Sequence, residues 1–93
     1  MAELLSDGEI DARLASVRWT REGDEIVRDW KLEDFAAAIA FVNRVADVAE
    51  AANHHPDILV HGWNKVKLAL TNHSAGGLTE ADFEMATKFD ALD

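Results

Sequence analysis

All four histidines of the chain lie between positions 54 and 73, and two of them are adjacent. The stretch from 53 to 57 reads NHHPD, so His54 and His55 stand directly before the only proline, Pro56. Histidine is the side chain whose ordinary pKa, about 6.5, lies closest to neutral pH. A positioned group of this kind speeds proton transfer by roughly 10²- to 10⁴-fold. The cluster is therefore a candidate for general acid–base chemistry.

A metal site and a purely structural role compete with this interpretation. The side chains of two adjacent residues diverge, and the sequence has no cysteine, no HxH and no HExxH, although three histidines from distant segments could still meet. His61 flanks a glycine turn and needs no role. For His54, His55 and His73, position alone leaves function and structure about equally supported. Ser74 beside His73 in sequence is not evidence for a nucleophilic triad.

The elements that must position these histidines follow from the apolar periodicity. Capping signals predict helices from Ser6 (with Glu9) to about residue 15 and from Thr79 (with Asp82) to the C-terminus. Spacings of three and four predict a central helix over 33–52. The residues expected to form its buried face are Phe35, Ala38, Ile39, Val42, Ala46 and Ala49, widened by Phe41, Val45, Val48 and Ala52.

Alternating stretches at 17–20, 26–30, 58–61 and 63–71 predict four strands. The order α-β-β-α-β-β-α indicates one α+β domain over residues 1–93, with a four-stranded antiparallel sheet and helices on one face. Pro56 should end the central helix, with Asn53 in the left-handed conformation, so that His54 and His55 sit at the helix exit.

Two carboxylates and one aromatic ring could assist the histidines. Glu50 lies four residues before His54, so the two could share a face and interact if the helix persists that far, and a solvated glutamate near the helix end is an equally supported alternative. Asp82 could orient a histidine, although its spacing from Thr79 favours a capping role. Trp63 offers a flat face for a bicyclic ring, but a strand tryptophan more often belongs to a core or an interface.

Composition limits the classes of protein. The chain has 93 residues and a formal net charge of −9, which disfavours direct binding of nucleic acid and of anionic membrane surfaces. No apolar run approaches the ~20 residues that span a bilayer. With no cysteine and no recognisable signal peptide, we expect a soluble, cytoplasmic protein. A core this small favours a homo-oligomer.

The combined pattern resembles the pterin-4a-carbinolamine dehydratase family. The matching residues are Glu50, His54-His55-Pro56, Trp63, His73, Gly76-Gly77-Leu78 and Asp82, with Phe41 to Ala46 resembling the family's central helix and Trp19 its first strand. The chain departs from the family pattern by one extra residue, expected at Gly62. Asn53 and Ser74 also stand where acidic residues are common.

The resemblance implies loss of water from a 4a-hydroxytetrahydropterin, giving the quinonoid dihydropterin, without metal or cofactor. It implies that His54, His55 and His73 are catalytic, with His54 the principal acid–base group. Substrate contacts are implied for Asn53, Thr71, Asn72 and Ser74 besides the histidines, with Glu50, Pro56, Trp63 and Asp82 supporting. It also implies a homodimer or homotetramer. The alternative is a non-catalytic module, since the fold also serves in dimerisation of a transcription factor and in assembly factors.

Overall fold

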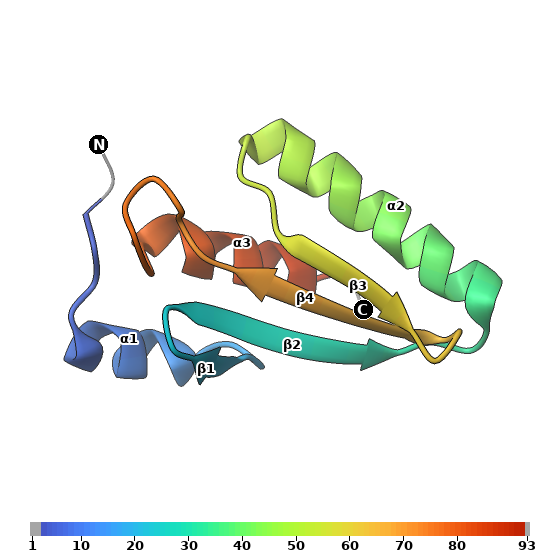
Figure 1. The fold of residues 1–93 in the computed structure, drawn as a ribbon, viewed down its shortest axis with the longest axis horizontal. Helices are drawn as coiled ribbons and strands as arrows, with labels where there is room; N and C mark the ends of the chain where they lie inside the picture. The colour runs from blue at the N-terminus through green and yellow to red at the C-terminus, as the bar shows by residue number, and fades with distance from the viewer. Residues whose placement is uncertain (1–2, 93) are drawn as a thin grey trace.

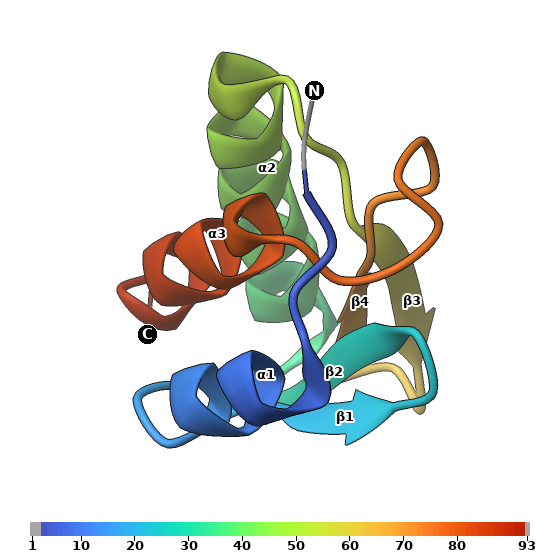
Figure 2. The same ribbon diagram turned by 90° about the vertical axis from the view of Figure 1, so that its left-hand side faces the viewer.

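The computed structural model describes residues 3–92 and contains the seven elements in the expected order. Their bounds are α1 (Asp7–Leu14), β1 (Thr20–Glu22), β2 (Glu25–Lys31), α2 (Phe35–Ala52), β3 (Asp57–His61), β4 (Lys65–Leu70) and α3 (Glu80–Asp90). The strands form one antiparallel sheet in the order β1-β2-β4-β3, and the helices pack on one of its faces (Figures 1 and 2). This confirms the α+β prediction and adds the strand order, which periodicity alone does not determine.

The helix starts follow the capping signals. Ser6 and Glu9 form a reciprocal capping box at α1, with bonds of 2.9 and 3.2 Å. Asp34 caps α2 by accepting the Ala37 N–H at 2.7 Å. At α3 the Asp82 carboxylate accepts the Thr79 N–H at 2.9 Å. Each bond satisfies a donor that the first helical turn leaves without a partner.

The central helix is rotated relative to the predicted face. Its buried residues are Ala38, Phe41, Val45 and Ala49, with Val42 and Val48 partly buried. The prediction was wrong for Phe35, Ile39, Ala46 and Ala52, which are exposed. The helix's own apolar residues cover much of its circumference. Their spacing therefore predicts a helix but does not determine which side faces the sheet. The packing of Phe41 against Trp30, with ring centroids 4.9 Å apart, shows which side does.

The first strand begins later than predicted, because Trp19 belongs to the core rather than to the ladder. Its ring packs edge-on against Trp30 at 5.7 Å, and its indole N–H donates to Asp90 at 2.7 Å. The strand pairing starts only at Thr20. In β4 the predicted alternation is confirmed, with Val66, Leu68 and Leu70 fully buried.

Among residues 3–92, no helix is long and apolar enough to cross a membrane.

Candidate active site

The chain leaves α2 through a tight turn that presents the two adjacent histidines. Asn53 adopts the left-handed conformation, with φ 52° and ψ 40°. The His54 N–H bonds to the Ala49 carbonyl and the Asn53 N–H to the Glu50 carbonyl, both at 3.2 Å. These are the two bonds of a Schellman motif. Pro56 follows and the chain continues into β3, so the prediction of a sharp helix exit is confirmed.

His54 is held by a buried carboxylate of α3. Its Nε2 lies 2.6 Å from Asp82 Oδ1, while Asp82 Oδ2 accepts the N–H of Thr79 at 2.9 Å and its hydroxyl at 3.2 Å. Asp82 is fully buried, and the His54 side chain is only 18% exposed. An ionised carboxylate can only accept, so pairing with Asp82 assigns the shared proton to Nε2 of His54. Nδ1 is then the nitrogen of His54 that can gain or lose a proton.

Asp82 therefore does both things that the sequence left as alternatives, because each of its oxygens has a different partner. One oxygen caps the first turn of α3 and the other orients the histidine. A buried carboxylate is stable only when its lone pairs are matched by donors, and here all three donors come from two segments of the chain. The same carboxylate thus caps α3 and orients His54, so a change at Asp82 affects both.

His55 has its own carboxylate, and it is the one considered as a partner of His54. Glu50 Oε2 lies 2.5 Å from His55 Nε2, at a more exposed position than the buried His54–Asp82 pair. The sequence left open whether Glu50 interacts with His54 or is solvated, and the structure pairs this largely exposed side chain with His55 instead. The left-handed turn at Asn53 ends the helical spacing, so residues 50 and 54 no longer share a helix face. Asn53 need not supply a charge to either histidine, because Glu50 and Asp82 already do.

His73 reaches the same region from a loop that its neighbour Asn72 organises. The Asn72 side chain accepts the Ala75 N–H at 2.9 Å, and its backbone bonds both ways with Gly77. Gly76 has φ 82°, a conformation that favours glycine. Gly77 leaves little room for a side chain, since a Cβ there would lie 3.2 Å from Leu4. The loop is therefore held by hydrogen bonds between its own residues, and His73 on it is exposed.

The three histidines line one pocket of about 220 Å³. Its other lining residues are Asn53, Thr71, Asn72 and Ser74, so every residue expected to contact substrate lies here. In Figure 1 the helix exit and the loop after β4 lie at the same end of the sheet. His54 and His55 carry carboxylate partners, whereas within residues 3–92 no hydrogen bond or ion pair reaches the His73 ring. The site thus combines two oriented imidazoles with one that has both nitrogens available.

Trp63 is not brought to this pocket. It lies in the β3–β4 turn, at the opposite end of the sheet from the helix exit (Figure 1). Gly62, where the extra residue is expected, and Trp63 have φ values of 53° and 58°, so both adopt the left-handed conformation in this turn. The Trp63 side chain is 62% exposed there. It cannot serve as a platform for a ligand bound at the histidines of the same chain.

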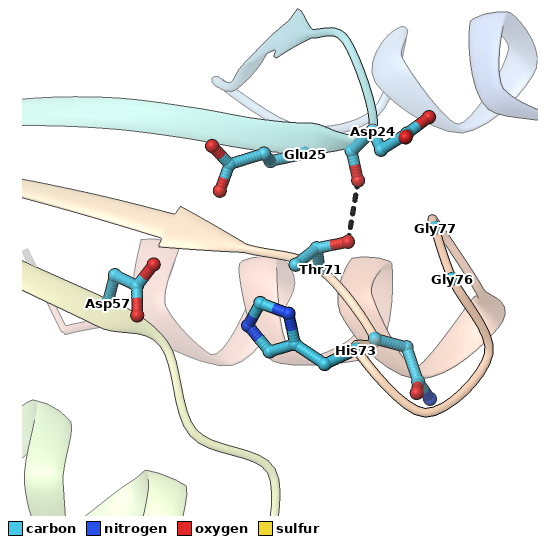
Figure 3. Close-up of a pocket in the computed structure, with 8 residues that line it drawn as sticks. Asp24, Glu25, Asp57, Thr71, His73, Gly76 and Gly77 are labelled. Carbon is cyan, nitrogen blue, oxygen red and sulfur yellow. Dashed lines mark hydrogen bonds between the residues drawn. The ribbon is translucent and has the colours of Figure 1, made fainter.

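A second, larger cavity of about 450 Å³ adjoins the histidine pocket, and sequence reasoning missed its acidic lining. The two cavities share Thr71, Asn72 and His73, and the larger one adds Asp24, Glu25 and Asp57 (Figure 3). Because β2 and β3 flank β4 and run antiparallel to it, they begin where β4 ends. No local motif marks these acidic residues, since only the strand order brings them together.

The arrangement suits proton transfer to and from a bound small molecule. Three imidazoles meet in one pocket, and Asp82 and Glu50 can stabilise the charged forms of two of them. Over the part of the chain that the structure describes, no group of three histidine, aspartate or glutamate side chains is placed to hold a metal ion.

Comparison with known proteins places this chain in a family. The family described as Pterin 4 alpha carbinolamine dehydratase matches residues 3–92. A protein of Roseiflexus sp. strain RS-1, provisionally named pterin-4-alpha-carbinolamine dehydratase, is 54% identical over 93 residues, covering 99% of both chains. One of Chloroflexus aurantiacus with the same provisional name is 54% identical over 89 residues, covering 95% of both.

Solved structures show the same fold. A crystal structure titled transcriptional coactivator/pterin dehydratase, from Brucella melitensis, superposes with a TM-score of 0.90 at 32% identity, covering 97% of this chain and 98% of that one. A pterin dehydratase-like protein identified as a RuBisCO assembly factor in the alpha-carboxysome superposes with a TM-score of 0.64 at 25% identity, covering 82% and 87%. The chain belongs to the pterin-4-alpha-carbinolamine dehydratase family.

Proposed function

We propose that this chain dehydrates 4a-hydroxytetrahydropterin to quinonoid dihydropterin and water by histidine acid–base catalysis, as a step in tetrahydropterin recycling. The observation that carries the proposal is the meeting of His54, His55 and His73 in one pocket, with a buried carboxylate behind His54. Family membership and the dehydratase names of the relatives supply the reaction class.

The reaction needs two proton transfers and no change of oxidation state. The proton on N5 of the pterin leaves, and the N5–H electron pair forms the N5=C4a double bond. The C4a–O bond breaks at the same carbon, and its hydroxyl takes up a proton to depart as water. One base and one acid therefore suffice, and each should titrate near neutral pH.

We assign the base to His54 and the acid to His73. When Nδ1 of His54 accepts the N5 proton, the ring becomes a cation, and Asp82 at 2.6 Å stabilises that cation. His73, whose ring has no partner among the described residues, can donate to the departing hydroxyl from either nitrogen. His55, held by Glu50, binds the pterin and assists. Asp82 and Glu50 are positioning residues in this scheme, because they act through a histidine.

A stopped-flow assay with enzymatically generated 4a-hydroxytetrahydropterin tests the proposal. We expect the wild-type chain to accelerate the dehydration well above its spontaneous rate, independently of added metal or chelator. A rate equal to the spontaneous one would contradict the assignment. It would favour the alternative, a non-catalytic dimerisation, assembly or coactivator module, the kind of role that the titles of the two related structures mention.

We also propose that the chain is a homo-oligomer, a dimer or a tetramer. β3 is an edge strand whose second ladder side is unpaired in the single chain, and its Ile58 and Leu59 are 39% and 54% exposed. On α2, Phe35 is 55% exposed. Exposed apolar side chains along an edge strand favour association with another chain. Light scattering should give a multiple of 10.3 kDa, and a Leu59→Lys variant should lower it. A monomeric wild type would refute the proposal.

The remaining expectations on partners and location stand as part of this proposal. The net charge of −9 and the acidic cavity argue for a neutral or cationic small-molecule substrate rather than direct binding of nucleic acid. A chain without cysteine suits the reducing cytoplasm, where we place it. Cell fractionation with an antibody checks the location, and recovery in a membrane or secreted fraction would contradict it.

A further inference from the structure

We propose that the cavity adjoining the histidine pocket binds the pyrimidine edge of the pterin, and that Asp57, with Glu25, accepts hydrogen bonds from the 2-amino group and N3–H of the ring. This inference rests on the proposed function, because it names how the substrate of that site is held. It assigns a binding role to residues that the reaction itself does not require.

The sizes of the two cavities give the first argument. Ligand pockets usually measure about 300–1,000 Å³. The histidine pocket, at about 220 Å³, falls below that range, whereas the adjoining cavity measures about 450 Å³. Thr71, Asn72 and His73 line both. A bicyclic ring whose reacting N5–C4a bond lies at the histidines can therefore place its other part in the adjoining cavity, which shares His73 with the histidine pocket.

The chemistry of the lining gives the second argument. Asp24, Glu25 and Asp57 contribute three carboxylates, and the residues lining the cavity include no lysine and no arginine. Figure 3 shows the Asp57 carboxylate directed toward the His73 ring, with Glu25 on the other side of the end of β4. The Asp24 side chain points away, and its backbone carbonyl instead accepts the Thr71 hydroxyl at 2.6 Å.

Within the described residues, neither the Asp57 nor the Glu25 side chain has a hydrogen-bond or ion-pair partner. An ionised carboxylate accepts hydrogen bonds and donates none. The pyrimidine edge of a pterin presents two neighbouring N–H donors, which a carboxylate can accept together, and such bidentate pairing adds orientation as well as affinity. The fold also fixes the spacing, because Asp57 and Glu25 begin strands that pair with β4 on either side.

Binding of the stable, fully oxidised pterin and its 2-oxo analogue, followed by ligand fluorescence, tests the proposal. We expect Asp57→Asn to raise the Kd for pterin about tenfold, and Glu25→Gln to raise it less. The 2-oxo analogue lacks the donated amino group, so the wild type should bind it more weakly and Asp57→Asn should change its Kd little. In turnover, Asp57→Asn should raise KM and leave kcat near the wild-type value.

Asp47→Asn is the matched control, since it removes one exposed negative charge from α2 and lies outside both cavities. An unchanged pterin Kd in both cavity variants would overturn the proposal, and so would an equal loss for both ligands. If the wild type accelerates dehydration while Asp57→Asn behaves as wild type, only this binding role fails. A wild type that gives no acceleration refutes the proposed function instead.

Discussion

Asp82 is the residue whose substitution tests the account most sharply. It caps α3 and orients His54, and an isosteric substitution leaves it unable to do both in the same way. The carboxylate accepts from Thr79 N–H through one oxygen and from His54 Nε2 through the other. Asp82→Asn keeps the shape but leaves one acceptor oxygen for three donors, which are the Thr79 N–H, the Thr79 hydroxyl and His54 Nε2. The Thr79 amide cannot give up its proton, whereas His54 can move its own from Nε2 to Nδ1. We therefore expect the cap of α3 to persist and His54 to change tautomer.

The expected size of the effect follows from the lost interaction. A hydrogen bond to a charged group contributes about 1.5–3 kcal/mol, and each 1.4 kcal/mol corresponds to a factor of ten in rate, so kcat should fall roughly 10- to 100-fold. The bond concerned is 2.6 Å long and involves a carboxylate that is fully buried, which supports the upper half of that range. The protonated Nδ1 can no longer accept the N5 proton, so this loss should appear in kcat more than in KM.

The assay is stopped-flow dehydration across a pH series, with urea unfolding of the same protein. Asp90→Asn is the matched control: Asp90 is another largely buried carboxylate of α3, but its partners are the Trp19 indole, the Arg28 guanidinium and the Arg18 backbone N–H rather than a histidine. We expect Asp90→Asn to change stability and leave kcat unaltered. If Asp82→Asn kept the wild-type kcat and pH profile while remaining folded, the argument that Asp82 fixes the proton on Nε2 would be refuted.

Three further predictions concern the scaffold. Asn53→Ala should destabilise the chain by about 1–2 kcal/mol in urea unfolding, because Asn53 has φ 52°, whereas Asn53→Gly should be close to neutral; equal effects would refute the argument. Asp90→Ala should cost about 1–3 kcal/mol by leaving the buried Trp19 N–H unpaired, and wild-type stability would contradict this. The backbone and hydroxyl bonds of Ser6 hold the pKa of Glu9 below its usual 4.5, so the stability that Glu9 adds is present above pH 4.5 and lost as the pH falls through the lower folded value. Amide exchange in α1 should rise over that range, and Glu9→Gln should remove the dependence; identical pH profiles would count against it.

The caps of α1 and α3 and the exit of α2 could be predicted from the sequence, because each is determined by neighbouring residues. Ser6 with Glu9, and Asn53 before Pro56, produce the cap and the turn that their spacing indicates. The rotation of α2 about its own axis could not be predicted, because its apolar residues cover too wide a face of the helix. Contacts with the sheet decide that Phe41 is buried and that Phe35 is exposed.

The candidate site, like the fold, could be predicted from the sequence only in part. The pattern of the family indicated the histidines, and the structure places all three in one pocket. Their carboxylate partners depend on tertiary geometry. The left-handed turn at Asn53 places His55 beside Glu50, and the packing of α3 places Asp82 beside His54. The acidic cavity depends on β4 lying between β2 and β3, a strand order that no local pattern encodes.

The most direct measurement of the central claim compares the dehydration rates of His54→Ala and His61→Ala with that of the wild type. His54 lines the pocket with Asp82 behind it, whereas His61 lies on the sheet near the opposite end of β3, 3.8 Å from Asp29. We predict that His54→Ala lowers kcat at least tenfold while His61→Ala keeps the wild-type rate. Unchanged turnover in folded His54→Ala, or an equal loss in both variants, would contradict the account.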